Sequence, residues 1–200
     1  MFFLDSEKQC KILDAAQEVF LRYGFKKATM GDIARGAGMS RPSVYLVYCN
    51  KEEILRAVIT RKIDHSFQEA QENASQCSGM EARMTAILDA WILAPFKLIQ
   101  TSPESQELLD FVYSFAPDLR KRMLKMFEEQ LADAIRSDPE TNRDALAKAG
   151  LGIELVARLI AVSTAELKYS VKEVAELEQL LAATVKIHVS FLTGRCVPAA

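Results

Sequence analysis

The stretch Thr29-Met-Gly-Asp-Ile-Ala-Arg-Gly-Ala-Gly-Met-Ser-Arg-Pro-Ser-Val-Tyr-Leu-Val-Tyr-Cys-Asn-Lys51 predicts two short helices that meet at a tight turn. In the first helix, Met30, Ile33, Ala34 and Ala37 recur at the spacing of one apolar helix face. Gly38 can adopt the left-handed conformation that ends a helix. After it, Ser40 can cap a second helix whose first turn accepts Pro42. This arrangement is a helix-turn-helix.

The second helix has one face suited to a core and one suited to a nucleic acid. Val44 and Tyr48, four residues apart, share the predicted inner face. Arg41, Ser43 and Tyr45 lie on the outer face near the N-terminus, the end that a helix-turn-helix presents to base edges in the major groove. This helix is therefore predicted to be the recognition helix.

Both ends of the stretch also carry helix-capping signals. Thr29 can cap the first helix while its hydroxyl faces a phosphate. Asn50 and Glu53 form a capping-box pattern, which places Lys51 at the start of a further helix.

The charge around the stretch favours a polyanionic partner. Residues 22–51 contain six basic residues and one acidic residue, a local charge of +5 in a chain whose net charge is −2. Up to Thr60 there are nine basic and seven acidic residues (+2), which leaves sixteen basic and twenty acidic residues (−4) for the remainder. Only the N-terminal part is suited to nucleic acid.

Composition favours helices and gives no sign of catalysis. The chain of 200 residues is 50% hydrophobic, with 8 glycines and 6 prolines. Its four cysteines form no metal or redox pattern, and there is no catalytic motif, so we expect no enzyme, no metal site and no cofactor. Neither a signal peptide nor an apolar run of 18 residues is present, which predicts a soluble cytoplasmic protein with no membrane partner.

The N-terminal quarter closely resembles the DNA-binding head of the TetR family of transcriptional regulators. The residues that carry this resemblance are Ile12-Leu-Asp-Ala-Ala16, Phe20, Gly24-Phe25, Thr29, Ile33-Ala34, Ala37-Gly38-Met39-Ser40, Val44-Tyr45, Tyr48 and Asn50-Lys51-Glu52-Glu53-Ile54-Leu55. The resemblance implies an all-α protein, with a three-helix helix-turn-helix head at 1–50 and a larger helical domain for effector binding and dimerisation at 51–200.

The resemblance also implies roles for residues of the head. Thr29, Tyr45 and Lys51 would touch phosphates, and Arg41, Pro42 and Ser43 would approach bases. Two positions depart from the family pattern. Val47 stands where the family usually has an aromatic residue or His, and Tyr48 where it has Phe, so one customary phosphate contact is not expected at Val47.

The middle of the chain is rich in large apolar side chains, most of which ordinary core packing would explain. Met and aromatic residues also suit an adaptable pocket, which predicts an apolar or aromatic small-molecule effector. The candidate ligand-binding residues are Met84, Trp91, Phe96, Phe111, Tyr113 and Phe127. Pro95 is expected to kink the helix predicted over 80–100. Asp89, Glu107 and Asp110 fit solvated helix faces better than a site for a cationic ligand.

Two long apolar helices at the C-terminus resemble the pair through which the family dimerises. A two-fold homodimer would set two recognition helices on a palindromic operator. The candidate dimerisation residues are Leu155, Leu159, Val162, Leu177, Leu181, Thr184, His188 and Phe191.

The sequence leaves alternatives open. A carrier or sensing module that no longer binds DNA would be consistent with Val47, and an enzyme would need a site among the middle helices that no motif indicates. Cys49 could be an oxidisable thiol, although a small core residue explains it more simply. His65 and His188 fit structural roles better than catalytic ones.

Overall fold

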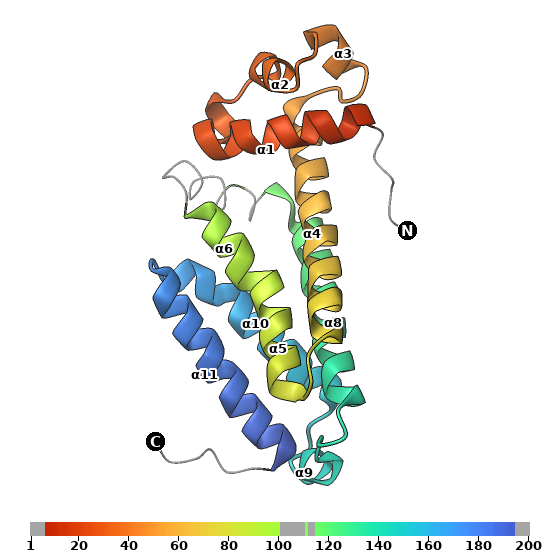
Figure 1. The fold of residues 1–200 in the computed structure, drawn as a ribbon, viewed down its shortest axis with the longest axis vertical. Helices are drawn as coiled ribbons and strands as arrows, with labels where there is room; N and C mark the ends of the chain where they lie inside the picture. The colour runs from red at the N-terminus through yellow and green to blue at the C-terminus, as the bar shows by residue number, and fades with distance from the viewer. Residues whose placement is uncertain (1–6, 101–110, 112–114, 195–200) are drawn as a thin grey trace. The chain divides into compact units, whose positions relative to one another are not determined.

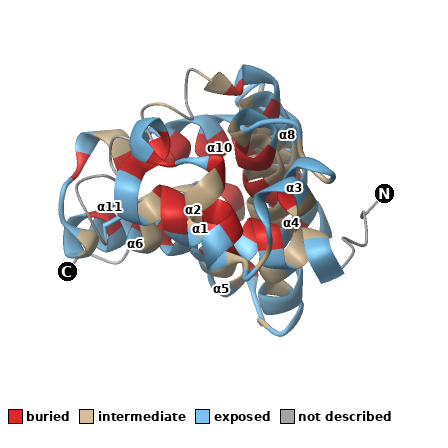
Figure 2. Ribbon diagram, turned by 90° about the horizontal axis from the view of Figure 1, so that it is seen from above, coloured by how far each residue is buried: buried red, intermediate tan, exposed pale blue. Residues whose placement is uncertain are grey.

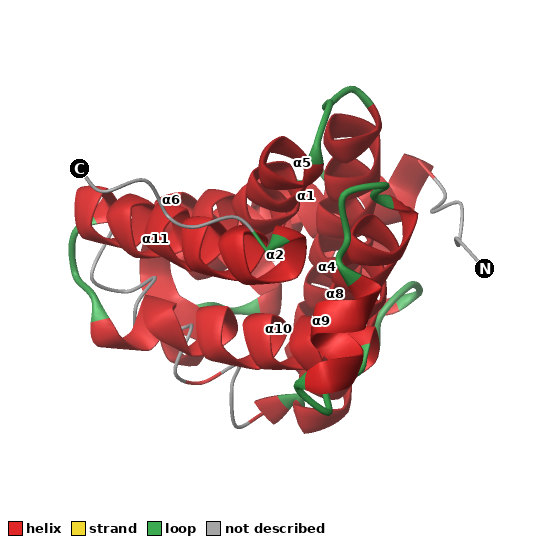
Figure 3. Cartoon of the chain, turned by 90° about the horizontal axis from the view of Figure 1, so that it is seen from below, coloured by secondary structure: helices red, strands yellow, loops and turns green. Residues whose placement is uncertain are grey.

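The computed structural model describes residues 7–100, 111 and 115–194. All regular structure in this part of the chain is helical, as the all-α prediction requires (Figure 1, Figure 3). The helices are α1 Glu7–Lys27, α2 Met30–Gly36, α3 Arg41–Tyr45, α4 Lys51–Ser75, α5 Met80–Leu88, η1 Asp89–Leu93, α6 Ala94–Ile99, α8 Pro117–Ser137, α9 Arg143–Lys148, α10 Ile153–Ser170 and α11 Val174–Thr193.

Contacts divide the chain into two compact units. Unit 1 contains residues 1–65 and 98–120, and unit 2 contains 66–97 and 121–200. Helix α4 therefore contributes its first part to unit 1 and its last part to unit 2.

Unit 1 is built on an apolar core that α1, α2, α3 and the start of α4 share. Ile12 and Phe20 of α1, Ile33 of α2, Val44 of α3 and Ile54 of α4 each expose 1% of their surface or less. The buried residues of α1 and α2 are red in Figure 2. Removal of this apolar surface from water is the main force that holds three short helices together.

The apolar stripe of the first helix, followed by Gly24, predicts that this helix ends at Tyr23. Helix α1 continues beyond Tyr23, but with a break. Gly24 has φ 73° and ψ 161°, and the chain then makes one further turn to Lys27. Glycine makes this break possible, because other residues rarely adopt this backbone conformation.

In unit 2, the helix predicted over 80–100 contains a π-helical turn. The N–H of Ala94 donates to the carbonyl of Asp89, five residues earlier. Pro95 follows directly and has no N–H to donate. The expected irregularity therefore lies in the turn that precedes the proline.

Two predictions about unit 2 are wrong in detail. The segment 137–150, with Asp138-Pro139 and Asn142, predicts a loose connection. It contains helix α9, whose N-cap Asn142 accepts from the N–H of Ala145 at 2.9 Å. The residues Ser170-Val-Lys-Glu173 predict a capping box at the start of the last helix. This box is absent, because the Ser170 hydroxyl donates back to the Leu167 carbonyl and α11 begins only after Glu173.

Among the described residues, none of the helices combines the length and the apolar character needed to cross a membrane. The same residues contain no group of three or more His, Cys, Asp or Glu side chains that could hold a metal ion.

Candidate nucleic-acid interface

Helix α2 begins with a complete capping box. The Thr29 hydroxyl oxygen accepts from the N–H of Asp32 at 3.2 Å, and the Asp32 carboxylate accepts from the Thr29 N–H at 3.1 Å. The Thr29 hydroxyl also donates to this carboxylate at 2.6 Å, and Arg35 donates to it at 3.3 Å. These contacts hold the pKa of Asp32 below its usual range, with the Thr29 hydroxyl as the largest cause.

The turn between α2 and α3 depends on Gly38, which has φ 64°. The N–H of Met39 donates back to the Ala34 carbonyl at 2.9 Å, and this bond closes the end of α2. Ser40 caps α3 as predicted, since its hydroxyl accepts from the N–H of Ser43 at 3.3 Å. The two serine hydroxyls are 2.8 Å apart.

Helix α3 turns one face into the core of unit 1 and the other into solvent. Val44 is fully buried, and Ser43 is half-buried. Arg41, Pro42 and Tyr45 are exposed, so three of the residues predicted to approach DNA lie open at the surface of α3. A Cβ built on Gly31 would lie 3.7 Å from Cδ and Nε of Arg41, which places the Arg41 side chain beside the first turn of α2.

The Lys51 ammonium group donates to backbone carbonyls, whereas the resemblance implied that it touches a phosphate. Its Nζ donates to three carbonyl oxygens: those of Phe25 at 2.9 Å and Lys26 at 3.3 Å in the last turn of α1, and that of Ala28 at 3.1 Å just after it. It also lies 4.5 Å from the centroid of the Phe25 ring. An ammonium group has three N–H donors, and all three are used on these carbonyls.

The residues after α3 return to the core of unit 1. Val47 and Tyr48 are half-buried and pack against the core, which gives a structural reason for the apolar side chain at Val47. Cys49 is exposed, and its N–H donates to the Glu53 carboxylate at 2.9 Å. The Glu53 N–H donates to the Asn50 side chain at 2.8 Å, so half of the predicted capping box is present there.

The candidate ligand-binding residues fall into different parts of the fold. Met84, Trp91, Phe96 and Phe127 are buried in unit 2, where the Trp91 and Phe127 rings stack at 5.7 Å. Phe111 belongs to unit 1 and stacks on Phe25 at 4.6 Å. Tyr113 lies outside the described residues.

Unit 2 contains an open groove of about 620 Å³. Its lining comes from the C-terminal part of α4, from α5 and from the C-terminal part of α8. Gln130 lines this groove and joins two elements, because it accepts from Trp91 Nε1 at 2.6 Å and donates to the Phe67 carbonyl at 2.9 Å. Trp91 is thus one hydrogen bond away from the groove without lining it.

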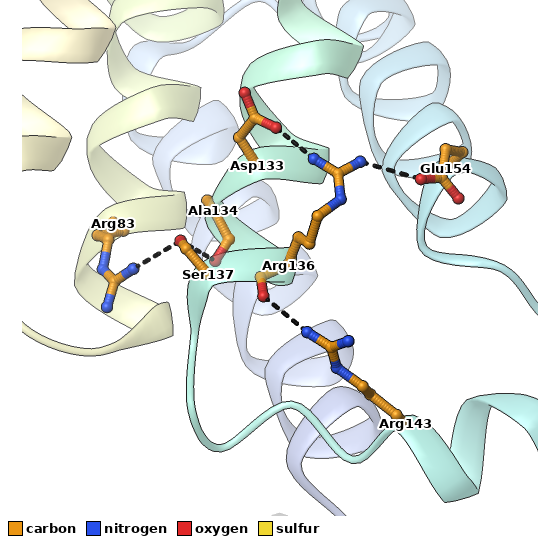
Figure 4. Close-up of polar contacts among 7 residues, drawn as sticks. All are labelled: Arg83, Asp133, Ala134, Arg136, Ser137, Arg143 and Glu154. Carbon is orange, nitrogen blue, oxygen red and sulfur yellow. Dashed lines mark hydrogen bonds and ion pairs between the residues drawn. The ribbon is translucent and has the colours of Figure 1, made fainter.

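Arginine side chains fix the end of α8 beside this groove (Figure 4). Arg83 donates to Ser137 at 3.2 Å. It also donates to the buried carboxylate of Asp138 at 3.2 Å. Arg143 donates to the carbonyl of Arg136 at 3.2 Å. Cations and donors at a helix C-terminus satisfy its free carbonyls and complement its dipole.

Some of the candidate dimerisation residues are buried in unit 2, and others are exposed. Leu177 and Leu181 are buried in unit 2 itself, so they are not accessible to a partner. Leu155, Leu159, Val162 and Phe191 expose between 40% and 60% of their surface. Thr184 and His188 bind backbone carbonyls of α11: the Thr184 hydroxyl donates to Leu180, and His188 Nδ1 lies 2.7 Å from the carbonyl of Thr184.

The sequence-based prediction missed three exposed apolar residues. Leu180 and Ile187 lie on α11 and expose 37% and 62% of their surface, and Leu46 exposes 88% just after α3. For Leu46 and Ile187 the signal is helical phase, since each lies two residues after a buried residue, Val44 or Val185, and so on the opposite helix face.

A helix-turn-helix with an exposed arginine and tyrosine on its second helix, inside a basic region, is an arrangement typical of DNA-binding proteins. Residues 12–58 match the family described as bacterial regulatory proteins, tetR family. In this region the chain is similar to transcriptional regulators of the TetR family.

Two relatives show how far the similarity extends. The HTH-type transcriptional regulator YfiR of Bacillus subtilis is 35% identical over 83 residues, which are 42% of this chain and 40% of YfiR. The HTH-type transcriptional activator FasR of Mycolicibacterium smegmatis is 26% identical over 164 residues, 82% of this chain and 72% of FasR. The match therefore covers about two fifths of YfiR and most of FasR.

The fold is shared along almost the whole chain with a transcriptional regulator from Cytophaga hutchinsonii. The TM-score is 0.76 at 20% sequence identity, over 94% of this chain and 100% of the other.

Proposed function

We propose that this chain is a ligand-responsive transcriptional repressor that binds an inverted-repeat DNA operator as a homodimer in the cytoplasm. One observation carries the proposal: α3 is capped by Ser40, anchored by buried Val44, and presents Arg41 and Tyr45 to solvent. A helix that is capped, anchored and exposed in this way, in a region of charge +5, suits the major groove.

Within the proposed interface, the roles follow from position. Arg41, Pro42 and Ser43 approach bases, and Arg41 has the bidentate donors that recognise guanine. Tyr45 and Thr29 donate to phosphates, although the Thr29 hydroxyl must first leave the Asp32 carboxylate. Lys51 acts indirectly, because its ammonium stabilises the turn that precedes Thr29.

Dimerisation would use the exposed faces of α10 and α11. Leu155, Leu159 and Val162 follow one another at intervals of four and three residues, which places them on one face of α10. Ile187 and Phe191 form a similar pair on α11. Helices with exposed apolar stripes are stabilised when a second copy covers them.

The effector would bind in unit 2, as a small apolar or aromatic molecule. Support comes from the groove of about 620 Å³, a volume typical of small-molecule sites. Residues 1–50 would then bind DNA, and residues 51–200 would bind the effector and the partner subunit. An effector releases DNA only if it binds the two conformations of the dimer with different affinity.

A second candidate function is activation of transcription. The relative FasR is named a transcriptional activator, and it is similar to this chain over 164 residues. The two functions differ only in the direction of the effect on the regulated gene.

Selection of genomic DNA by the purified protein, followed by a search for an inverted repeat, tests the proposal. We expect one palindromic motif, and a reporter gene behind it should be silenced by the protein. Arg41→Ala should reduce discrimination against a mismatched site by about 1–3 kcal/mol. Recovery of random DNA alone, or equal losses on operator and random DNA for Arg41→Ala, would contradict it.

A further inference from the structure

Leu46 is the most exposed large apolar residue of the described chain, with 88% of its surface accessible. The other strongly exposed ones, Leu155, Leu159 and Ile187, lie on the two helices proposed for dimerisation and expose between 55% and 62%. Leu46 lies in unit 1 instead, directly after the proposed recognition helix. The dimer interface therefore does not account for it.

The backbone places Leu46 on the outer face of α3. Its N–H donates to the carbonyl of Pro42 at 3.0 Å, so the helical path continues to Leu46 and puts the two side chains one turn apart on the same side. Pro42 is exposed as well. Arg41 and Tyr45 form the adjacent exposed pair, also one turn apart. The outer face thus has an apolar row, Pro42 and Leu46, beside a polar row.

The next residue shows that this exposure is specific to Leu46. Val47 follows it immediately, yet is half-buried and packs against the core of unit 1. Its N–H donates to the carbonyl of Val44, the fully buried residue of α3. The chain thus turns inward after Leu46.

The chemistry of the major groove selects one partner for such a row. Base edges in the groove present hydrogen-bond donors and acceptors, and the only apolar group among them is the C5-methyl of thymine. A leucine pressed against any other base edge would cover polar groups without satisfying their hydrogen bonds. The basic region around Leu46 favours a polyanion such as DNA over an uncharged apolar partner.

We propose that Leu46 is a specificity-determining residue that packs against the C5-methyl group of a thymine in each half of the operator. This inference rests on the proposed DNA-binding function. Arg41 and Leu46 are five residues apart, about 7.5 Å along a helix axis. With base pairs about 3.4 Å apart, a helix that lies along the groove places the thymine about two base pairs from the base read by Arg41.

Replacement of single thymines by deoxyuridine in a selected operator tests the inference, because it removes the methyl group and leaves every hydrogen-bonding group in place. Binding of the full-length protein is measured by fluorescence anisotropy at constant salt concentration. Burial of one methyl group corresponds to about a fourfold change in affinity, and two symmetric half-sites to about fifteenfold. We expect this loss at one symmetric pair of thymines.

Two variants assign the effect to the side chain. Leu46→Ala should bind the unmodified operator more weakly and should no longer distinguish thymine from deoxyuridine at that pair. Leu46→Met, which keeps an apolar side chain of similar size, should retain the distinction. Because Leu46 is almost fully exposed, both variants should fold as the wild type does, which circular dichroism verifies.

Three results would overturn the inference. The wild type could be indifferent to deoxyuridine at every position, or Leu46→Ala could keep the full sensitivity of the wild type. Either result would leave the DNA-binding function intact and remove Leu46 from base recognition. Failure of the wild type to bind any selected DNA would reject the proposed function together with this inference.

Discussion

Replacement of Lys51 by methionine separates two roles for this residue. Lys51→Met keeps an unbranched apolar stem of similar length and removes the ammonium group that binds the carbonyls of Phe25, Lys26 and Ala28. The structure predicts a loss of stability in unit 1. A direct phosphate contact would instead predict a loss of DNA affinity with unchanged stability.

The magnitude follows from the three bonds and the ring. The bonds to Phe25 and Ala28 are part-buried, and each contributes about 1 kcal/mol once access of water is taken into account. The bond to Lys26 is exposed, so water replaces it at little cost. The ammonium beside the Phe25 ring adds about 0.5 kcal/mol. We expect Lys51→Met to lower the free energy of unfolding by about 2.5 kcal/mol.

Urea unfolding followed by two signals measures this loss. Far-ultraviolet circular dichroism reports helices of both units, whereas fluorescence of Trp91, the only tryptophan, reports unit 2. The dichroism transition should begin at lower urea concentration, while the Trp91 transition should change little. Lys27→Met is the matched control, because it removes the same charge from an exposed position at the end of α1.

One pattern of results would refute this reasoning. If Lys51→Met had wild-type stability and reduced the salt dependence of operator binding by about one unit, the ammonium would contact phosphate rather than serve as a cap. The contacts of Lys51 in the structure instead predict reduced stability and an unchanged salt dependence of operator binding.

Three further predictions concern the turn, the dimer and acid. Gly38→Ala should destabilise the protein by about 1 kcal/mol, because Gly38 has φ 64°. A Cβ at this position would meet no other atom within 4 Å, so the backbone conformation alone causes the loss. Gly38→Asn should recover part of the loss in urea unfolding, and wild-type stability of the alanine variant would contradict this prediction. Leu159→Asp, at a position 60% exposed, should convert the proposed dimer into monomers in sedimentation experiments, and an unchanged mass would exclude this face. The Thr29 hydroxyl lowers the pKa of Asp32, so the ionised carboxylate stabilises the helix cap at pH values above the ordinary pKa of an aspartate. This contribution is lost as the pH falls below about 4. NMR titration should show the pKa of Asp32 moving toward its usual value in Thr29→Ala, and an unmoved pKa would mean that another group lowers it.

Local signals predicted the head well because its short helices begin and end at residues that act on their own backbone. The caps at Thr29 and Ser40 and the turn at Gly38 involve neighbours only a few residues away. For the same reason the start of α4 at Lys51 was predictable. The missed helix α9 has such a signal too, since Asn142 is its cap, but it is short and carries a weak apolar pattern.

The burial of individual residues on α11 was less predictable. Leu177, Leu180 and Leu181 are adjacent or nearly so, and the resemblance to the family suggested Leu177 and Leu181 as dimerisation residues. In the structure these two fill the core of unit 2, and Leu180 remains partly exposed. A helix that is apolar on two sides does not reveal which side faces its own chain.

The sequence by itself determined the helical class, the helix-turn-helix and the outward position of Arg41 and Tyr45, because caps, turns and helical phase act over a few residues. The tertiary structure alone decided what distant groups do to one another. It brought the Lys51 ammonium to carbonyls more than twenty residues away, placed Phe111 on Phe25, and linked Trp91 to the groove through Gln130. Such contacts depend on how helices pack, and packing is set by the whole core rather than by any local pattern.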